Sequence, residues 1–384
     1  MELSSEDSFR LNVLLANRPQ AIRIDESRLI VYALAEQGEA KVRLNPTGRP
    51  EQYLRAVREL ISGHVLGSPG GYPVYLRRWT RMGQMRDQSL EQLLLLGEPE
   101  AVVAAAGAPG LTETLARRAW WAMEDAENAR RMLRNPNIIA STMGPILAGY
   151  LVEYLPFETE SERIIESVRL VLQPGLLAVE TRLALWQKAA RKPAYLVGFL
   201  HALPHDLPQP LPARDDLQQR QQPLGALLQA ADNPPARLLL QSASAAGQTF
   251  LATLATVLAK PPNQEIITAL FEVLRAYFAE LRPHGDPDLP IAALQADSRA
   301  FIDPDRADPA VRACLAASPT AADELAAMRL LSGVGYGLLR PLLPDPTTAG
   351  TLMRRRLGPA TNPLLDAVAC LRGEPQPQPA RGSR

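Results

Sequence analysis

Proline placement is the feature that most limits what this chain can fold into. The sequence holds 35 prolines in 384 residues, nearly twice the usual share of roughly 5 %. A proline removes a backbone donor and breaks the interior of a helix. From about residue 89 onward, the prolines divide the chain into short blocks rich in Leu, Ala, Arg and Glu. We therefore expect many helices of modest length, separated at or near the prolines.

The N-terminal part shows a different periodicity. Ile22 and Ile24 alternate with charged residues, residues 29–34 form a short apolar run, and Val42 and Leu44 alternate with basic residues. Turn-like residues separate the three segments, a pattern that predicts a three-stranded meander. The predicted fold class is therefore mainly α and multi-helical, with a small N-terminal α+β region that contains this β-meander.

Composition along the chain predicts the domain organisation. Residues 203–222 contain four prolines and five glutamines without apolar periodicity, which is typical of a linker. The predicted parts are a small α+β region at 1–88, a helical domain at 89–203, a Pro/Gln-rich linker at 204–222, a second helical domain at 223–372 and a disordered tail at 373–384. Within the second helical domain we expect helices over 234–260, over 263–281, and from Ser318 to about Arg340.

The overall composition excludes several classes of protein. The chain has 41 basic and 41 acidic side chains, 46 % apolar residues and a mean hydropathy of −0.10, as in a soluble globular protein. Four histidines and two cysteines make a four-cysteine zinc or iron–sulfur site within one chain impossible. His201 and His205 have the i, i+4 spacing of a metal pair, but Pro204 lies between them. We predict no catalytic residues, no metal site and no cofactor.

Two features bear on location. Met1–Arg10 contains three acidic residues and no basic stretch followed by an apolar run, so we expect no export signal and a cytoplasmic protein. The stretch Leu238–Ala259 lacks charge but holds seven hydroxyl or amide side chains, and Ile138–Val152 is short for a membrane span. We interpret both as buried helices and expect no membrane insertion.

A local excess of arginine is the sharpest charge feature. Residues 49–86 contain seven arginines against two glutamates, a net charge of +5 in a neutral chain. Within this segment, Tyr75, Arg77, Arg78, Trp79 and Arg81 interleave aromatic rings with guanidinium groups. Single-stranded nucleic acid is bound by such stacking and phosphate contacts. A solvated face or a partner-docking surface explains the same residues, and is the interpretation we favour.

Two glycine-rich stretches are candidate ligand loops. Gly70 and Gly71 could direct backbone N–H groups at an anion, but no Gly-Lys-Ser/Thr follows and Pro69 removes a donor, so a plain turn is favoured. Residues 333–337 hold three glycines without a preceding strand, which excludes a dinucleotide fingerprint. Close helix packing or a helix break is the predicted reason for those three.

The two cysteines are the remaining candidates for chemistry. Cys314 lies about six residues into a helix that Asp308 caps and Pro309 begins, beyond the turn where the helix dipole lowers a thiol pKa. Cys370 lies near a helix C-terminus, where the dipole disfavours a thiolate, although Arg372 partly opposes this. We favour buried, inert thiols. A persulfide carried on either sulfur is the alternative.

Three long strings resemble one family. They are SSEDSFRLNVLLANRPQAIRIDES, SGHVLGSPGGYPVYLRRWTRMGQMRD and RRAWWAMEDAENARRMLRNPNIIASTMGPILAGYLVEYLPFETESERIIESVRL. They are similar to DsrS, the sulfur reduction protein encoded among the dissimilatory sulfite reductase genes of sulfur-oxidising bacteria, most strongly over residues 1 to about 200. The resemblance implies a cytoplasmic protein accessory to the oxidation of stored sulfur. It carries no catalytic residue, ligand or cofactor to this chain.

Three functional hypotheses follow. The leading one is a regulatory or assembly protein of dissimilatory sulfur oxidation that acts by binding a protein partner rather than by catalysis. The second is a persulfide-handling carrier or enzyme that uses Cys314 or Cys370. The third is an RNA-binding regulator that uses the basic segment 75–86.

Overall fold

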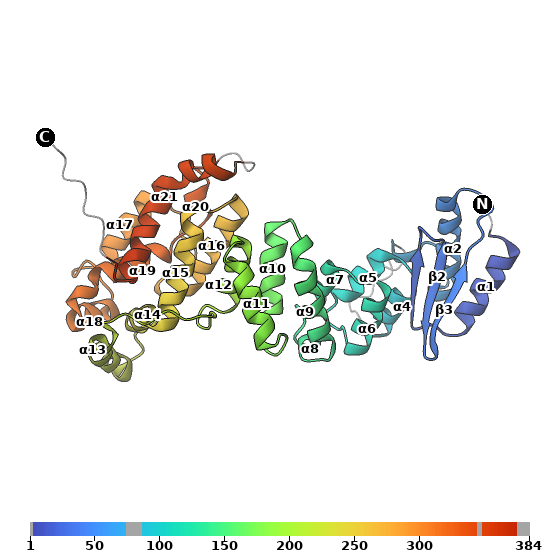
Figure 1. Ribbon diagram of the computed structural model, residues 1–384, viewed down its shortest axis with the longest axis horizontal. Coiled ribbons are helices and arrows are strands. Elements are labelled where there is room, and N and C mark those ends of the chain that lie inside the picture. The colour runs from blue at the N-terminus through green and yellow to red at the C-terminus, as the bar shows by residue number, and fades with distance from the viewer. Residues whose placement is uncertain (1–2, 74–86, 344–347, 375–384) are drawn as a thin grey trace. The chain divides into compact units, whose positions relative to one another are not determined.

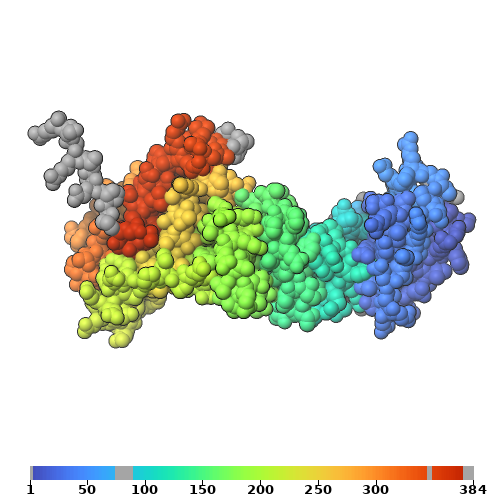
Figure 2. Space-filling model, viewed as in Figure 1, coloured from blue at the N-terminus to red at the C-terminus, as the bar shows by residue number. Residues whose placement is uncertain are grey.

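The computed structural model describes residues 3–73, 87–343 and 348–374 (Figure 1). The predicted fold class is confirmed: the chain is mainly α, with one small antiparallel sheet near the N-terminus. It divides into two compact units. Unit 1 is Met1–Phe157 with Gln173–Leu177, and unit 2 is Glu158–Leu172 with Ala178–Arg384. The space-filling view shows that side chains occupy the space between the ribbons of each unit (Figure 2).

Unit 1 begins with a helix, continues through the sheet and ends in short helices. Its elements are α1 (Ser5–Ala16), β1 (Ala21–Asp25), β2 (Ile30–Ala35), β3 (Gly38–Arg43), α2 (Pro50–Leu66), α4 (Asp87–Leu94), α5 (Pro99–Ala106), α6 (Glu113–Ala122), α7 (Ala126–Met132), α8 (Pro136–Ile139), α9 (Met143–Tyr154) and the 3₁₀ turn η1 (Leu155–Phe157).

The three strands form the predicted meander. β2 pairs antiparallel with both neighbours, and the register sets Ile22 opposite Ala33 and Val31 opposite Val42. Because side chains alternate across a strand, these apolar residues share one face of the sheet. There they join a buried core to which α1 contributes Leu11. The alternation read from the sequence is therefore the alternation of the sheet.

Helix α1 is an element for which the sequence analysis made no prediction. The Ser4 hydroxyl caps it by accepting a hydrogen bond from the Asp7 N–H. The Asp7 side chain is buried and accepts bonds from the Tyr53 hydroxyl and the Asn45 N–H, at 2.5 and 2.7 Å. These bonds tie α1 to α2 and to the residues after β3. Helix α2 ends at Gly67, which has a positive φ of 69°.

Unit 2 is built from helices and short 3₁₀ turns. Its elements are α10 (Ser161–Val171), α11 (Val179–Ala189), α12 (Pro193–Ala202), α13 (Leu217–Ala230), α14 (Pro234–Ala243), α15 (Ala245–Ala259), α16 (Gln264–Tyr277), η2 (Ala279–Leu281), α17 (Ile291–Phe301), α18 (Pro309–Ala317), η3 (Pro319–Ala321), α19 (Ala322–Leu331), α20 (Tyr336–Leu339) and α21 (Gly350–Leu371).

Helix α12 is the apolar centre around which α10 and α16 pack. Residues 194–200 of α12 are all buried. At Gly198 the backbone approaches α10 so closely that a Cβ atom would lie 2.6 Å from Val168 Cβ. Asn263, the N-cap of α16, donates to the Ser161 hydroxyl at 2.8 Å, so the N-termini of α10 and α16 lie together. The outer sides of these helices consequently share one region of the surface.

The helix predicted over 234–260 is wrong as a single element. The structure has α14 and α15, with a bend of 77° between them. The Ser244 hydroxyl accepts a bond from the Gly247 N–H and starts a new helix. A Cβ atom at Gly247 would lie 2.0 Å from the Gln241 carbonyl oxygen, so the bend requires glycine there. Within the described ranges, no single helix is long and apolar enough to cross a membrane, although this bent pair meets the criterion of length and composition as a pair.

The helix predicted from Ser318 to about Arg340 is also divided. α19 ends at Leu331 and α20 begins at Tyr336. Between them the loop 282–290 comes close: a Cβ atom at Gly335 would lie 2.0 Å from the Asp286 carboxylate. The predicted reason for the glycines at 333–337, close packing with a helix break, is confirmed.

The predicted linker 204–222 is only partly irregular. Residues 217–222 are the first turns of α13, and the whole segment lies within unit 2. The structure instead divides the chain near Phe157 and Glu158. Pro223 lies inside α13, and α21 contains Pro359 and Pro363. These three prolines do not end their helices, so the expectation that helices separate at or near prolines is wrong for α13 and α21.

Candidate functional site

The part of the predicted basic segment that interleaves aromatic rings with arginine lies outside the described residues. Tyr75, Arg77, Arg78, Trp79 and Arg81 all fall within residues 74–86. Their proposed binding of a partner or of nucleic acid therefore stays a prediction.

The glycine-rich loop is held by the chain's own side chains. The Gly71 N–H donates to the Ser62 hydroxyl at 2.8 Å, and the Tyr72 N–H donates to the Glu98 carboxylate at 3.0 Å. A Cβ atom at Gly71 would lie 1.8 Å from Glu98 Oε1. Gly70 has a φ of 116°, which requires glycine. An internal carboxylate, that of Glu98, thus occupies the place beside Gly71 and Tyr72 that an anion would take.

Both thiols lie where the protonated form is favoured. Cys314 is fully buried, and its Sγ donates to Asn233 Oδ1 at 3.3 Å. Burial raises the pKa of the Cys314 thiol to about 11. For Cys370, burial first, and then the carboxylates of Glu324 and Asp323, raise the pKa to about 11. A thiol that is protonated at neutral pH is a weak nucleophile, so these surroundings do not support a persulfide on either sulfur.

The two histidines of the i, i+4 pair have separate surroundings. The His201 ring is 3.4 Å from Arg169 Nη1. The His205 ring lies against the ring of Tyr277, with centroids 5.4 Å apart, and is 3.3 Å from Gln241 Nε2. Across residues 3–73, 87–343 and 348–374, no three or more His, Cys, Asp or Glu side chains are grouped to hold a metal ion.

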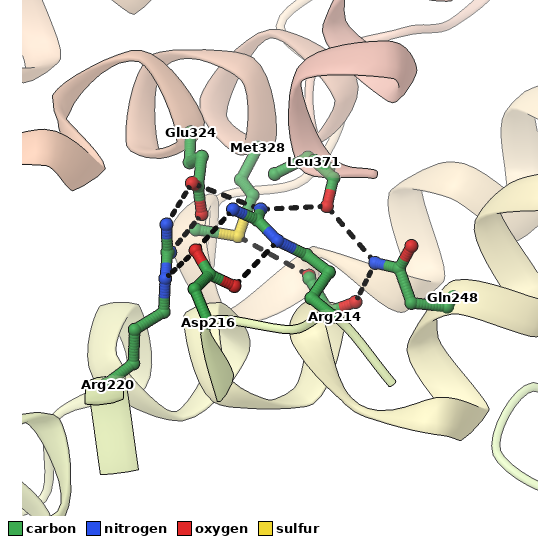
Figure 3. Close-up of polar contacts among 8 residues, drawn as sticks. Arg214, Asp216, Arg220, Gln248, Glu324, Met328 and Leu371 are labelled. Carbon is green, nitrogen blue, oxygen red and sulfur yellow. Dashed lines mark hydrogen bonds and ion pairs between the residues drawn. The ribbon is translucent and has the colours of Figure 1, made fainter. Parts of the chain in front are cut away.

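A buried ion network, which the sequence analysis did not predict, fastens the supposed linker to the core of unit 2 (Figure 3). Arg220 donates to both carboxylate oxygens of Glu324, at 2.6 and 2.7 Å, and to Asp216 at 2.7 Å. Arg214 donates to Asp216 at 2.7 Å and to Glu324 at 3.1 Å. Glu324 is 5 % exposed and the side chains of Arg214 and Arg220 are 12 % and 9 % exposed, whereas the side chain of Asp216 is 33 % exposed.

The same network reaches the end of the last helix. The Leu371 carbonyl oxygen accepts from Arg214 Nη1 and from Gln248 Nε2, both at 3.2 Å (Figure 3). Two guanidinium groups face two carboxylates, so the network is neutral, and its groups satisfy one another. We conclude that it is a structural clamp joining residues 214–220 to α15, α19 and α21. The i, i+4 spacing of Asp216 and Arg220 was the one signal of it in the sequence.

The described surface of unit 2 carries an open hollow of about 440 Å³ at α10, α12 and α16, which we call the acidic groove. Its lining residues are Glu162, Ile165, Glu166, Arg169, His201, Gln264, Glu265, Thr268, Ala269 and Glu272.

Helical spacing produces this lining. On α10, Glu162, Glu166 and Arg169 are at i, i+4 and i+7, which places them along one side of the helix. On α16, Glu265 and Glu272 are at i and i+7, with Thr268 and Ala269 between them. The buried side chain of Ile165 supplies an apolar floor. Carboxylates thus line both helical walls above an apolar base.

The groove is electrostatically unbalanced. Four carboxylates face one guanidinium, a net charge of −3 when His201 is neutral. Burial, and next the Arg169 charge, lower the pKa of the His201 ring from its ordinary value, which favours the neutral ring. Glu162 and Glu265 lie in the first turns of their helices, where they also complement the helix dipoles. Glu166 and Glu272 lie beyond the first turns, so interaction with the helix dipoles does not explain their presence.

Comparisons with protein-family models, with curated proteins and with solved structures find no match to this chain. The acidic groove is therefore assessed on its own residues and geometry.

Proposed function

We propose that this protein acts by binding, as an accessory factor that receives a cationic segment of a partner protein in the acidic groove. The observation that carries the proposal is the pairing of carboxylates on α10 and α16 around one open hollow. Complementary charge across an interface steers association and selects partners. The groove accordingly favours a partner that carries lysine or arginine.

The shape of the groove further limits which segments of a partner could bind there. A volume of about 440 Å³ is enough for a few side chains. The apolar floor at Ile165 and Ala269 suits an aliphatic residue between two basic ones. A helix laid into a groove presents such residues at i, i+3 and i+4. We therefore propose a basic, amphipathic helix as the bound segment.

The resemblance to DsrS supports a biological setting for this binding. The third string that carries it, residues 117–170, includes Glu162, Glu166 and Arg169 of the groove. On that basis we propose a cytoplasmic accessory protein of dissimilatory sulfur oxidation. Phosphate groups would be repelled by the groove, so an RNA ligand would have to use residues 75–86 instead.

A charge-neutralised variant tests the proposal. The probe is a fluorescent helical peptide with leucine and lysine at the i, i+3 and i+4 spacing of one helix face, with a glutamate-for-lysine peptide as reference. If each lost charge pair contributes about 0.3–1 kcal/mol, the double substitution Glu166→Gln/Glu272→Gln should weaken binding about 3- to 30-fold. The variant Glu36→Gln/Glu51→Gln removes the same charge from exposed positions of unit 1 and is the matched control.

Fluorescence anisotropy at low and moderate salt gives the readout. Equal affinity of the groove variant and the control variant would show that the groove is not the binding site. Equal affinity for the lysine and glutamate peptides would contradict the charge argument altogether.

A further inference from the structure

A continuous row of aromatic side chains lies on the outer side of α9 in unit 1. We call Trp120, Tyr150, Tyr154 and Phe157, together with the exposed aliphatic residue Ile146 of α9, the aromatic ridge. Tyr150 contacts Trp120 edge to face, with ring centroids 4.8 Å apart. It stacks on Tyr154 at 6.1 Å with an angle of 7° between the rings, and Tyr154 lies 6.4 Å from Phe157.

Three members of the ridge are exposed, whereas Trp120 and Tyr150 are partly buried. Ile146 is 49 % exposed, Tyr154 38 % and Phe157 75 %. The opposite side of the helix packs into unit 1 through Met143, Leu147 and Leu151. Exposed apolar surface of this kind is unusual unless it serves binding. Since α9 is already held by its buried side, the outer rings are not needed to hold it in the fold.

The ridge is flanked by negative charge. The Tyr150 hydroxyl donates to the Glu124 carbonyl oxygen at 3.3 Å, which places residues 124 and 125 beside the rings. Burial first, and then the charges of Asp125 and Glu124, raise the pKa of Tyr150. Glu153 is exposed on α9 next to Tyr154. The two arginines of α6, Arg117 and Arg118, are paired with Glu113 and Glu91, at 3.1 and 3.2 Å.

From this combination we propose that the aromatic ridge binds an arginine-bearing segment of a partner protein. A guanidinium group stacks on an aromatic face while its N–H groups donate to a carboxylate. Tyr150, Tyr154 and Phe157 offer the rings. Glu124 and Asp125 place negative charge beside Tyr150, although Asp125 Oδ1 already accepts from the Asn128 N–H at 2.7 Å, and Glu153 is exposed on the same helix as Tyr154. Nucleic acid and anionic lipid are disfavoured because the same carboxylates repel phosphate.

This site is independent of the proposed function. The acidic groove lies in unit 2, and Tyr, Trp and Phe are absent from its lining. The ridge therefore predicts a preference for arginine over lysine that the groove does not. Binding is measured in the Glu166→Gln/Glu272→Gln background, so that groove binding does not obscure the result.

The experiment uses three labelled peptides, with arginine, lysine or citrulline spaced by glycine and serine. We expect the arginine peptide to bind at least threefold more tightly than the lysine peptide, and the citrulline peptide not to bind. Tyr154→Ala/Phe157→Ala should weaken binding of the arginine peptide at least tenfold. Phe9→Ala/Val13→Ala, which removes an exposed apolar pair from α1, should change the affinity for the arginine peptide less than twofold.

Three outcomes would overturn the inference. They are unchanged binding in Tyr154→Ala/Phe157→Ala, equal binding of the arginine and citrulline peptides, and a dimer in sedimentation that this variant abolishes. The dimer would assign the ridge to a second copy of the chain. If circular dichroism shows that the double alanine variant does not fold, Glu153→Arg replaces it. We again expect a tenfold loss of affinity for the arginine peptide, and an unchanged affinity would contradict the inference.

Discussion

Removing Glu324 should be among the most damaging single changes in unit 2. The Glu324 side chain is 7 % exposed and accepts three hydrogen bonds from the guanidinium groups of Arg214 and Arg220. Glu324→Ala leaves two largely buried cations with Asp216 as their one remaining carboxylate in the network. Breaking a buried ion pair by removing one partner costs about 3–5 kcal/mol, because an uncompensated charge stays behind.

A double-mutant cycle separates this cost from the value of the pair itself. Arg220→Met in the Glu324→Ala background removes one orphaned charge and should recover about 1–3 kcal/mol, since apolar replacements of buried pairs are often well tolerated. The exposed pair Arg55–Glu59 on α2, with side chains 82 % and 49 % exposed, is the matched control. Glu59→Ala should cost less than about 1 kcal/mol.

Urea unfolding followed by circular dichroism measures the loss in the transition of unit 2. Hydrogen exchange provides a local readout: the Arg214 N–H donates to the Ala243 carbonyl oxygen at 2.9 Å, and the Leu211 N–H donates to the Thr249 hydroxyl at 2.8 Å. Both amides should lose protection in Glu324→Ala. A loss of stability no larger than that of Glu59→Ala, with both amides still protected, would refute the clamp.

Two further predictions concern stability. The thiol pKa values of Cys314 and Cys370 rise from 9 to about 11 on folding, so the stability that the two thiols contribute is complete below pH 9 and is lost as the pH rises through 11. Between pH 8 and 11.5, the melting temperature should therefore fall more steeply for the native chain than for Cys314→Ala/Cys370→Ala. Parallel curves of melting temperature against pH would contradict this. Gly198→Ala should destabilise unit 2 by about 1–3 kcal/mol because the new methyl group meets Val168. Gly149→Ala in α9, which has open space around it, should instead stabilise unit 1 by about 0.5–1 kcal/mol. Thermal unfolding of both variants measures these changes, and equal effects on stability would rule out the packing explanation.

Local patterns predicted the parts of this fold that depend on neighbouring residues. The alternation around Ile22 and Val42 marks a sheet whose register follows from short turns. Asp308 caps α18 and Pro309 begins it, as expected, since a cap involves only the first turn of the helix. Gly67 ends α2 for the same local reason. Cys314 is buried, as expected, whereas Cys370 is partly exposed.

The candidate sites were beyond prediction because their residues are distant in the sequence. The clamp joins Arg214 to Glu324, 110 residues away, and to Leu371, 157 residues away. The acidic groove requires α10 and α16 to lie side by side, and the bond between Ser161 and Asn263 spans 102 residues. Each helix alone shows only an ordinary charged side.

The amino-acid sequence by itself determined the helical class, the meander and several helix ends, because these depend on backbone preferences and on contacts within a few residues. Tertiary packing decided that α13 and α21 continue through prolines, that 234–260 bends at Ser244, and that residues 204–222 belong to unit 2. It also decided which charges meet partners in the interior and which carboxylates gather at one place on the surface. Those outcomes depend on which distant side chains meet, since the energy of a buried charge is set by its partners and its access to water.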